Sequence, residues 1–194
     1  MFYKPEIRKA IRAKRMELTS EAVERAAKAV ATELVMHPSM INSQHIGFYM
    51  TDENELDPAP LVHALQKQGK SFYLPAIPPN QESISYYLYN TGDALLEDDN
   101  GILEPDITLA QPFATEDLDV ILVPVVAFDP ECNRIGRGAG HFDRTLEFCS
   151  KNSGSKRPQL IGLAYEFQKI PKVVVNDWDI PLDFIFTEEA VYQR

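Results

Sequence analysis

Residues 134 to 144, RIGRGAGHFDR, combine three alternating glycines with arginines and a carboxylate. Glycines leave the backbone N–H groups of a loop accessible, so that an anion can approach them closely. Arg134 and Arg137 add charged, planar N–H donors of the kind that phosphate oxygens prefer. The stretch therefore indicates a candidate phosphate-binding loop. Its glycines are Gly136, Gly138 and Gly140.

Asp143 lies at the end of the same loop, directly before Arg144. A carboxylate does not hold phosphate itself, but beside a phosphate it is a natural Mg²⁺ ligand. Alternatively, Asp143 caps the helix that follows. The glycine spacing fits neither the P-loop nor the dinucleotide-binding fingerprint. Because glycines are also common in plain turns, spacing alone leaves both a phosphate site and a flexible turn open.

A second concentration of positive charge lies at the N-terminus. Residues 1–15 contain six basic residues and one acid, a net charge of +5, whereas the remainder contains 13 basic and 28 acidic residues. On a helix, at about 100° per residue, four of these bases form a stripe beside an apolar face. A basic arm on a chain of net charge −10 favours a local anion site or a solvated helix face, and argues against general nucleic-acid binding. The stripe consists of Lys4, Arg8, Arg12 and Arg15.

The glycine loop needs a rigid element before it, and residues 119–128 give the strongest strand signal in the chain. Their sequence, DVILVPVVAF, is almost continuously apolar, which is typical of a central strand in a parallel sheet. A helix is expected after the loop, at 142–149. Ligands of open α/β sheets bind at loops between the carboxyl end of a strand and the next helix, whose N-terminus favours anions. This placement favours a phosphate-binding role.

Strands and helices alternate along the rest of the sequence. We therefore expect a single α/β domain over residues 1–194, with three layers (α/β/α) and a mostly parallel, Rossmann-like sheet. The predicted helices are 5–18, a second from Thr19 or Ser20 to about residue 34, and 59–69, which ends at Gly69. The other predicted strands are 45–50, 71–77, 83–90, 159–166 and 183–187, and residues 91–118 are expected to be loop-rich.

The sequence also limits the compartment and the partners. No apolar run approaches the ~20 residues of a membrane-spanning helix, and the charged N-terminus does not resemble a secretory signal. Cys132 and Cys149 are too few for a disulfide framework and lack metal-site spacing. We therefore expect a cytoplasmic protein that acts on small molecules, with neither a membrane nor a nucleic acid as partner.

The segment ILVPVVAFDPECNRIGRGAGHFDRTL, residues 121–146, resembles the signature of the 5-formyltetrahydrofolate cyclo-ligase family, also called methenyltetrahydrofolate synthetases. That signature is roughly VPGxAFDxxGxRLGxGxGYYDRxL. Lys4 and Arg8 match a basic pair of the family, and YMTDENELD matches a segment with a substrate-binding glutamate. The shorter stretches LPAI, GILEP and IGLAYEFQ follow in the family's order, so the resemblance extends over nearly the whole chain.

Members of that family convert 5-formyltetrahydrofolate and ATP, with Mg²⁺, to 5,10-methenyltetrahydrofolate, ADP and phosphate. The resemblance implies that Met50 and Glu55 hold the reduced folate and that Asp143 is the Mg²⁺ ligand. It also implies that the formyl oxygen attacks the γ-phosphate to give a phosphorylated imine, after which ring closure releases phosphate. The implied ATP contacts are Lys4, Arg8, Arg134, Ile135, Gly136, Arg137, Gly138, Ala139, Gly140, His141 and Phe142, with Arg134, Arg137 and His141 as the catalytic candidates.

Four positions depart from the family signature. Cys132 stands where glycine is usual, Ala139 stands where glycine or lysine is common, and His141 with Phe142 replaces a tyrosine pair. These departures leave open a non-catalytic folate- or nucleotide-binding paralogue. A sugar-phosphate isomerase on a related scaffold would also use the glycine loop, but no segment offers a convincing general base for enediol chemistry.

Further residues have two interpretations each. Asp179 and Asp183 match a late aspartate pair of the family and serve either a structural role or as a second metal ligand. Trp178 either packs or forms a wall of the site. The length of 91–118 makes this stretch a candidate mobile lid, and a monomer is the expected oligomeric state.

Overall fold

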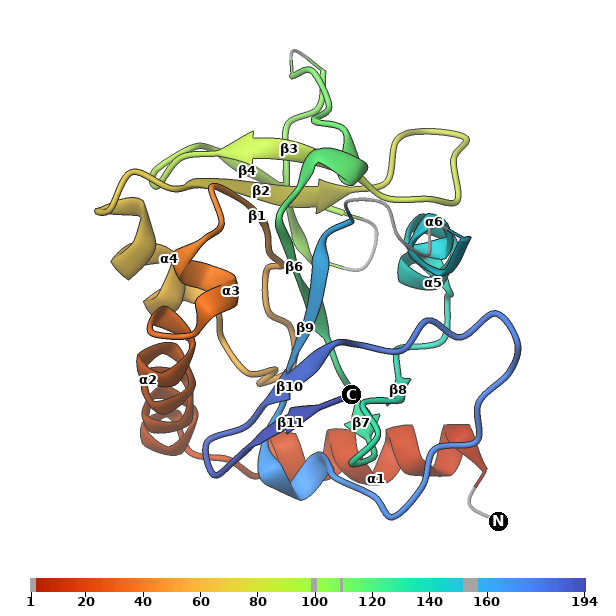
Figure 1. Cartoon of the computed structure of the whole chain (residues 1–194). Coiled ribbons are helices and arrows are strands. Elements are labelled where there is room, and N and C mark those ends of the chain that lie inside the picture. Colours follow the sequence, from red (N-terminus) through yellow and green to blue (C-terminus); the bar gives the residue numbers. More distant parts are fainter. Residues whose placement is uncertain (1–2, 99–100, 109, 152–156) are drawn as a thin grey trace.

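The computed structural model describes residues 3–98, 101–108, 110–151 and 157–194, and its centre is a seven-stranded mixed sheet (Figure 1). Five neighbouring strands are parallel, and one antiparallel strand lies at each edge. The prediction of a mostly parallel sheet is therefore confirmed. From edge to edge the strands are β11 (Val191–Gln193), β10 (Phe184–Phe186), β9 (Gln159–Leu163), β6 (Val120–Pro124), β1 (His45–Gly47), β2 (Ser71–Ala76) and β3 (Ser85–Tyr89).

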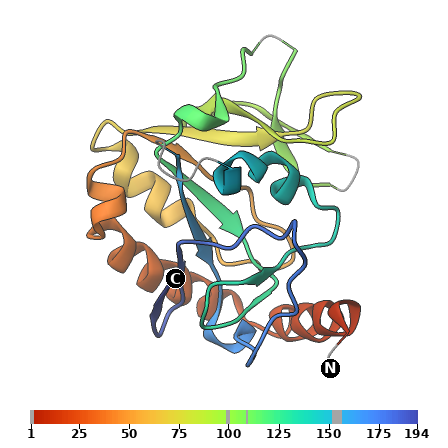
Figure 2. The same cartoon turned by 45° about the vertical axis from the view of Figure 1, so that its right-hand side comes forward.

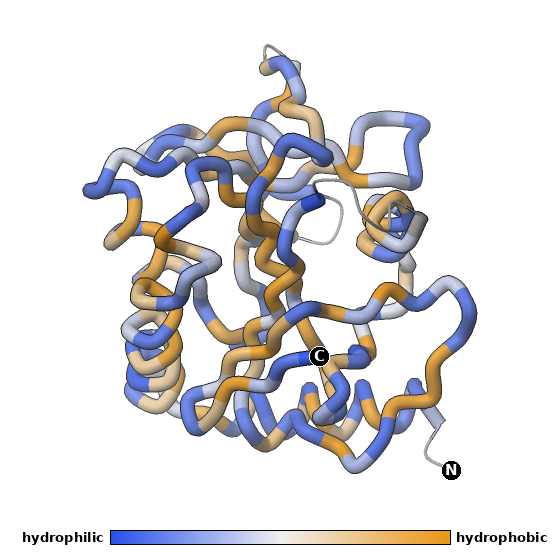
Figure 3. Tube along the Cα trace, viewed as in Figure 1, coloured by the Kyte–Doolittle hydropathy of each residue, from blue (hydrophilic) through white to orange (hydrophobic). Residues whose placement is uncertain are grey.

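Helices cover both faces of this sheet (Figures 1 and 2). Val120 and Leu122 of β6 belong to the core beneath the helices of one face, whereas Ile121 and Val123 belong to the core of the other face. Both faces of β6 are thus buried, which explains why its sequence is apolar at every position. Figure 3 shows the apolar residues concentrated along the central strands. The first face is covered by α2 (Ser20–Val35), α3 (Pro38–Ile41) and α4 (Ala59–Gln66), the second by α5 (His141–Thr145) and α6 (Glu147–Lys151).

The N-terminal helix α1 (Lys4–Met16) packs on a small hairpin formed by β7 (Ala127–Phe128) and β8 (Arg134–Ile135). Ile11 of α1 joins an apolar cluster with residues of this hairpin and with Val173. Figure 2 shows α1 lying along the end of the molecule where the hairpin projects. Because the glycine loop follows β8 directly, this docking brings the basic stripe of α1 to the loop.

The helix boundaries agree closely with the sequence. Thr19, one of the two residues predicted to cap the second helix, is the N-cap of α2. Its hydroxyl accepts a hydrogen bond from the backbone N–H of Ala22 at 3.3 Å. Gly69 follows α4 with a φ of 83°, a left-handed conformation typical of glycine after a helix. These signals were readable because capping depends on neighbouring residues alone.

The strand predicted at 119–128 is wrong in its extent. β6 ends at Pro124, and the chain leaves the sheet before β7 begins. The side-chain amide of Gln168 donates hydrogen bonds to the carbonyls of Val125 and Val126, at 2.7 and 2.8 Å, and so replaces the sheet partners of the interrupted strand. The apolar run continues because Val125 and Val126 are buried in the surrounding core rather than in the sheet.

Other differences concern short elements. The strand predicted at 45–50 stops at Gly47, and the helix predicted at 142–149 is two short helices, α5 and α6. Elements of three or four residues are too short to give a periodic signal, and several were missed for that reason. They are α3, the hairpin β4 (Leu95–Glu97) and β5 (Leu103–Pro105) in the region expected to be loop-rich, β11, and the 3₁₀ turns η1 (Thr115–Asp117) and η2 (Glu166–Gln168). Residues 99, 100 and 109 of the proposed lid lie outside the described residues.

Within the described residues, no helix combines the length and the apolar character needed to cross a membrane.

Candidate active site

The strand order reverses between β1 and β6. From β1 the chain continues through α4 to β2 on one side, and later reaches β6 on the other side of β1. The loops that leave the carboxyl ends of two such strands diverge and flank a crevice, which is the usual ligand site of open α/β sheets. Glu55 lies in the loop after β1, and the glycine loop follows β6 through the β7–β8 hairpin. The two sets of residues predicted from the sequence therefore meet at this switch point.

The three glycines of the loop differ in what they provide. Gly138 has a φ of 115° and Gly140 a φ of 75°, conformations that residues with a side chain rarely adopt. Gly136 has no such conformation, and a Cβ added there would meet no atom within 4 Å. The fold thus requires glycine at 138 and 140 but not at 136, where the bare backbone leaves room for a ligand.

The first half of the basic stripe of α1 contacts the glycine loop and its surroundings. The Nε of Arg8 donates a hydrogen bond to the carbonyl of Gly136 at 2.8 Å. A Cβ at Gly138 would lie 3.3 Å from the guanidinium carbon of Arg8, so this side chain rests against the bare backbone of the loop. Lys4 forms an ion pair with Asp179 at 2.9 Å. Lys4 and Arg8, predicted to bind ATP, therefore lie beside the predicted loop.

The second half of the stripe contacts the loop after β1. Arg12 pairs with Glu53. Arg15 is 3% exposed and lies 3.6 Å from a carboxylate oxygen of Glu53 and 3.3 Å from Oε1 of Glu55. No site role was predicted for Arg12 and Arg15, although both belong to the basic stripe that indicated a local anion site.

Glu55 lies between two arginines from distant parts of the chain. Its side chain is 5% exposed, and Oε1 accepts a hydrogen bond from Nε of Arg137 at 3.2 Å, with Nη2 of Arg137 at 3.1 Å. Nη1 of Arg137 also pairs with Asp52 at 2.9 Å. Although burial lowers the pKa of Arg137, the charges of Glu55 and Asp52 outweigh it and raise that pKa above its ordinary value. Arg137 therefore joins the glycine loop to the loop that carries Glu55.

Two buried tyrosines accompany this cluster. The hydroxyl of Tyr49 donates to the carbonyl of Leu56 at 2.8 Å, and burial raises the pKa of Tyr49 well above its ordinary value. The hydroxyl of Tyr165 has no hydrogen-bond partner among the described residues. Burial raises the pKa of Tyr165 to about 12, and its hydroxyl is close enough to Arg15 and Glu55 to interact with their charges.

Arg134 and Asp143 form the second ion pair of the loop. Nη2 of Arg134 donates to Oδ1 of Asp143 at 2.9 Å, and Nη1 of Arg134 donates to the carbonyl of Ile180. The backbone N–H of Ile180 also donates to Oδ1 of Asp143, at 3.2 Å. Arg134 is buried in this arrangement and directs its guanidinium to protein groups. A direct contact of this side chain with a ligand would require a change of partner.

Asp143 is the candidate ligand of the metal that the family signature implies. Its contacts with Arg134 and with the N–H of Ile180 both involve Oδ1, and the side chain is 25% exposed. Mg²⁺ in nucleotide sites is commonly held by one or two carboxylates, with phosphate oxygens and water completing the octahedron. A single carboxylate with one oxygen to spare fits that requirement. No cluster of three or more metal-ligating side chains occurs among the described residues.

The remaining predicted residues of the loop have mainly structural contacts. Ile135 is buried against α1, so that only its backbone is available to a nucleotide, and Phe142 is partly buried against the core beneath α5. Nδ1 of His141 lies 2.8 Å from the carbonyl of Glu82, away from Glu55 and Arg137. Ala139 is exposed. Met50 is partly buried against the core near Glu55.

The residues with two interpretations have distinct surroundings. Asp183 pairs with Arg157 at 2.6 Å and accepts a hydrogen bond from the backbone N–H of Leu160 at 2.8 Å. These contacts give Asp183 a structural role. Trp178 is 68% exposed and therefore does not pack in the core. Cys132, where the family signature has glycine, is fully buried and has a φ of 61°. That left-handed conformation explains why glycine suits this position.

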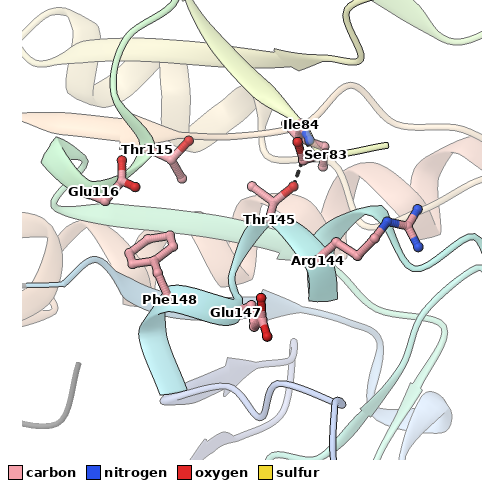
Figure 4. A pocket seen from close by; sticks show the side chains of 8 residues that line it. All are labelled: Ser83, Ile84, Thr115, Glu116, Arg144, Thr145, Glu147 and Phe148. Carbon is pink, nitrogen blue, oxygen red and sulfur yellow. Dashed lines mark hydrogen bonds between the residues drawn. The ribbon is translucent and has the colours of Figure 1, made fainter. Parts of the chain in front are cut away.

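A hollow of about 340 Å³ lies beside α5 and α6 (Figure 4). The hydroxyl of Thr145 accepts a hydrogen bond from the backbone N–H of Ile84 at 2.7 Å at its edge. None of the predicted site residues lines this hollow. Its lining residues are Ser83, Ile84, Thr115, Glu116, Arg144, Thr145, Glu147 and Phe148.

Comparison with known sequences identifies the family of the chain. A profile of the 5-formyltetrahydrofolate cyclo-ligase family matches residues 1–188. The chain is 30% identical over 184 residues to a 5-formyltetrahydrofolate cyclo-ligase of Escherichia coli K12, covering 94% of this chain and 99% of the relative. It is also 30% identical over 178 residues to the corresponding protein of Haemophilus influenzae, covering 91% and 93%.

Two solved structures resemble the fold over its whole length. The NMR structure of a 5,10-methenyltetrahydrofolate synthetase from Aquifex aeolicus has a TM-score of 0.82 and 32% identity, covering 99% of this chain and 93% of the other. A 5,10-methenyltetrahydrofolate synthetase from Mycoplasma pneumoniae has a TM-score of 0.75 at 23% identity, covering 96% and 99%, and supports the fold alone.

Proposed function

The chain belongs to the 5-formyltetrahydrofolate cyclo-ligase family and is a ligase of that family, and we propose that its reaction takes place at the switch point between β1 and β6. The reaction is the conversion of 5-formyltetrahydrofolate to 5,10-methenyltetrahydrofolate. ATP is the proposed co-substrate, released as ADP and phosphate. Neither substrate is large, so the proposal names small molecules and no macromolecule as partners.

One observation carries the proposal. Arg137 belongs to the glycine loop but its guanidinium contacts Glu55 and Asp52, which lie in the loop after β1. A nucleotide on the glycine loop and a folate on Glu55 would therefore be neighbours. A phosphoryl transfer between two substrates needs such proximity, because its rate depends mainly on positioning and charge neutralisation.

The nucleotide is assigned to the glycine loop and the start of α1. The accessible backbone at Gly136, together with Lys4 and Arg8, offers N–H donors and positive charge for a triphosphate. Arg137 is the catalytic candidate whose side chain is most accessible, at 38% exposed. Arg134 and His141 retain their predicted roles only if they exchange their present partners for a phosphate oxygen.

The reduced folate is assigned to Glu55, with Met50 as an apolar neighbour. A carboxylate accepts hydrogen bonds from adjacent N–H groups, and the amine and amide of a pterin ring present such donors side by side. Burial of Glu55 makes this recognition stronger than it would be in water, because the surrounding dielectric is lower. Met50, partly buried nearby, is the predicted apolar contact of the ring.

The proposed chemistry proceeds in two steps. The formyl oxygen attacks the γ-phosphorus of ATP, ADP leaves, and the formyl group becomes a phosphorylated imine. The neighbouring amine nitrogen then attacks the formyl carbon, and phosphate leaves with the former formyl oxygen. Arg137 neutralises negative charge on the γ-phosphoryl group while this group passes from ATP to the formyl oxygen. Such charge neutralisation is the main contribution that a protein makes to phosphoryl transfer. When Mg²⁺ is bound at Asp143, it supplies further charge neutralisation at the phosphates.

The direct test is an assay of purified protein with 5-formyltetrahydrofolate, ATP and MgCl₂. We expect growth of the absorbance band of the methenyl product, with one ADP released per product. Replacement of MgCl₂ by EDTA should abolish this growth if Asp143 holds the metal. Saturable folate binding without product would instead indicate a non-catalytic paralogue, the alternative raised by Ala139 and His141.

Monomeric state and cytoplasmic location complete the proposal. Light scattering of the purified protein tests the first, with a mass near 22.0 kDa expected. Fractionation of the source cells tests the second.

A further inference from the structure

We propose that Arg15 is a positioning residue of the folate site, which keeps Glu55 paired with a cation and correctly aimed when Arg137 turns to the nucleotide. The inference rests on the proposed function, since it assumes that Glu55 binds the folate. It goes further because Arg15 belongs to neither the glycine loop nor the loop of Glu55, and contacts no reacting group itself.

The two arginines around Glu55 differ in their freedom to move. Arg137 has a side chain 38% exposed and lies in the loop between Gly136 and Gly138. Arg15 has a side chain 3% exposed and extends from the last turn of α1. An exposed arginine on a loop can exchange one anion for another, whereas a buried arginine on a helix cannot leave its position without moving the helix.

The guanidinium of Arg15 is incompletely satisfied in the structure. Its Nε and Nη1 are buried and have no hydrogen-bond partner among the described residues. Nη1 lies 3.3 Å from Glu55 and Nη2 lies 3.6 Å from Glu53, so the charge is paired although the hydrogen bonds are not complete. A buried cation with unpaired N–H groups is costly for stability, and such costs are concentrated at functional sites. A purely structural ion pair would be expected to have closer geometry.

Helix α1 connects this cation to the nucleotide side. Arg8 contacts the glycine loop through the carbonyl of Gly136, and Arg15 contacts Glu55 seven residues later. Positions two helical turns apart lie on the same side of a helix. One rigid element therefore fixes the distance between the proposed nucleotide loop and the proposed folate carboxylate.

The need for Arg15 follows from the competition for Arg137. A triphosphate on the glycine loop attracts the guanidinium of Arg137. When Arg137 pairs with the triphosphate, its ion pairs with Glu55 and Asp52 weaken. A carboxylate that is 5% exposed and has no counter-ion is unfavourable, and tends to swing out toward water. With Arg15 in place, Glu55 keeps a counter-ion and remains an acceptor for the N–H groups of the pterin.

The test compares Arg15→Met and Arg15→Lys with the unchanged protein in the assay described above. We expect Arg15→Met to raise the KM for 5-formyltetrahydrofolate about 30-fold, because a charged hydrogen-bonding group is lost beside a buried carboxylate, with the KM for ATP changed by less than about 2-fold. Arg15→Lys retains the charge, so its KM for 5-formyltetrahydrofolate should lie close to that of the unchanged protein. Arg12→Met is the matched control, because Arg12 pairs with Glu53 and not with Glu55.

A second comparison separates positioning from folding. In a Glu55→Gln background, Arg15→Met should change the folate KM by less than about 3-fold, since the two residues act as one unit. Equal rises of both KM values in Arg15→Met, or an unchanged folate KM, overturn the inference. If Arg15→Met does not fold, Arg15→Gln, which also removes the charge, decides in its place: a selective rise of the folate KM supports the inference and no rise overturns it. Absence of product in the unchanged protein would instead contradict the proposed function itself.

Discussion

At the scale of single residues, the glycines of the loop are present for two different physical reasons. Gly138 and Gly140 have positive φ values, so their glycines are needed by the backbone whatever binds there. Gly136 has neither a positive φ nor a neighbour within 4 Å of an added Cβ. A ligand that approaches the backbone is the remaining physical reason for glycine at this position.

Alanine substitutions distinguish these reasons. Gly136→Ala should leave the free energy of unfolding unchanged within about 0.5 kcal/mol but raise the KM for ATP about 10-fold, because its methyl group occupies ligand space. Gly138→Ala should lower the free energy of unfolding by about 1–3 kcal/mol, because of its φ and because the Cβ presses on Arg8. Urea denaturation and steady-state kinetics measure both. An unchanged ATP KM in Gly136→Ala would remove Gly136 from the nucleotide site.

Asp143 combines a proposed metal-binding role with a structural one. Its Oδ1 is the carboxylate partner of buried Arg134, so removal of the whole side chain also leaves a buried cation unpaired. Asparagine keeps an oxygen acceptor for Arg134 and for the N–H of Ile180, but it is a much weaker Mg²⁺ ligand. The conservative substitution is therefore the informative one.

For Asp143→Asn we expect kcat to fall at least about 100-fold, with a loss of only about 1 kcal/mol in the free energy of unfolding. The MgCl₂ concentration that gives half-maximal rate should rise in the same variant. Asp183→Asn is the matched control: Asp183 pairs with Arg157 in the described structure, and its substitution should leave the Mg²⁺ dependence unchanged. Full activity of Asp143→Asn at the same MgCl₂ concentration would contradict the metal assignment.

At the scale of elements, the interruption between β6 and β7 places the glycine loop outside the sheet. The chain leaves β6 after Pro124, and the buried side chain of Gln168 satisfies the carbonyls of Val125 and Val126. The Oε1 of Gln168 also accepts the backbone N–H of Tyr165 at 2.8 Å. One side chain thus ties the exit of β6, which leads to the glycine loop, to the turn after the neighbouring strand β9.

Gln168→Leu tests this connection. The substitution preserves side-chain volume but leaves two buried carbonyls and one buried N–H without partners, and should lower the free energy of unfolding by about 2–4 kcal/mol. Chemical denaturation gives the value. Gln81→Leu, at an exposed position, should change it by less than about 0.5 kcal/mol. Equal stabilities of the two variants would show that water replaces the amide of Gln168.

At the scale of the whole molecule, buried and half-buried thiol and phenol groups link stability to alkaline pH. Burial raises the pKa of Cys132 and of Cys149 to about 11, from an ordinary value of 9.0. Burial likewise raises the pKa of Tyr165 to about 12, from 10.0. In each case the folded state holds the proton more tightly than the unfolded state. The contribution to stability is therefore complete below about pH 9 and is lost as the pH rises through the folded-state values.

We therefore expect the urea midpoint of unfolding to be constant from pH 7 to about pH 8.5 and to fall steadily between about pH 9 and pH 12. Tyr165→Phe should reduce the part of this fall above about pH 10, with little cost at neutral pH because its hydroxyl has no described partner. Tyr192→Phe provides the contrast, since its hydroxyl bonds Glu166 and Lys169. A midpoint that does not change up to pH 12 would contradict the burial of these groups.

Local patterns predicted most of the elements correctly. The apolar run of β6 indicated a central parallel strand, and Thr19 and Gly69 marked helix ends, because burial and capping depend on nearby residues. The three-residue strands of the β4–β5 hairpin and β11 were missed because they are shorter than any detectable period. The break after Pro124 was missed because its carbonyls are satisfied by Gln168, more than forty residues later.

The sequence by itself determined the α/β class, the glycine loop and a helix with one cationic stripe, since each follows from residue types at fixed local spacing. The family resemblance added Glu55 to these features. Only the tertiary structure decided that the stripe divides, with Arg8 at the glycine loop and Arg15 at Glu55, and that Arg137 spans both loops. These pairings join segments up to 128 residues apart. They depend on the strand order that reverses between β1 and β6, which is selected by packing of the whole core rather than by any local pattern.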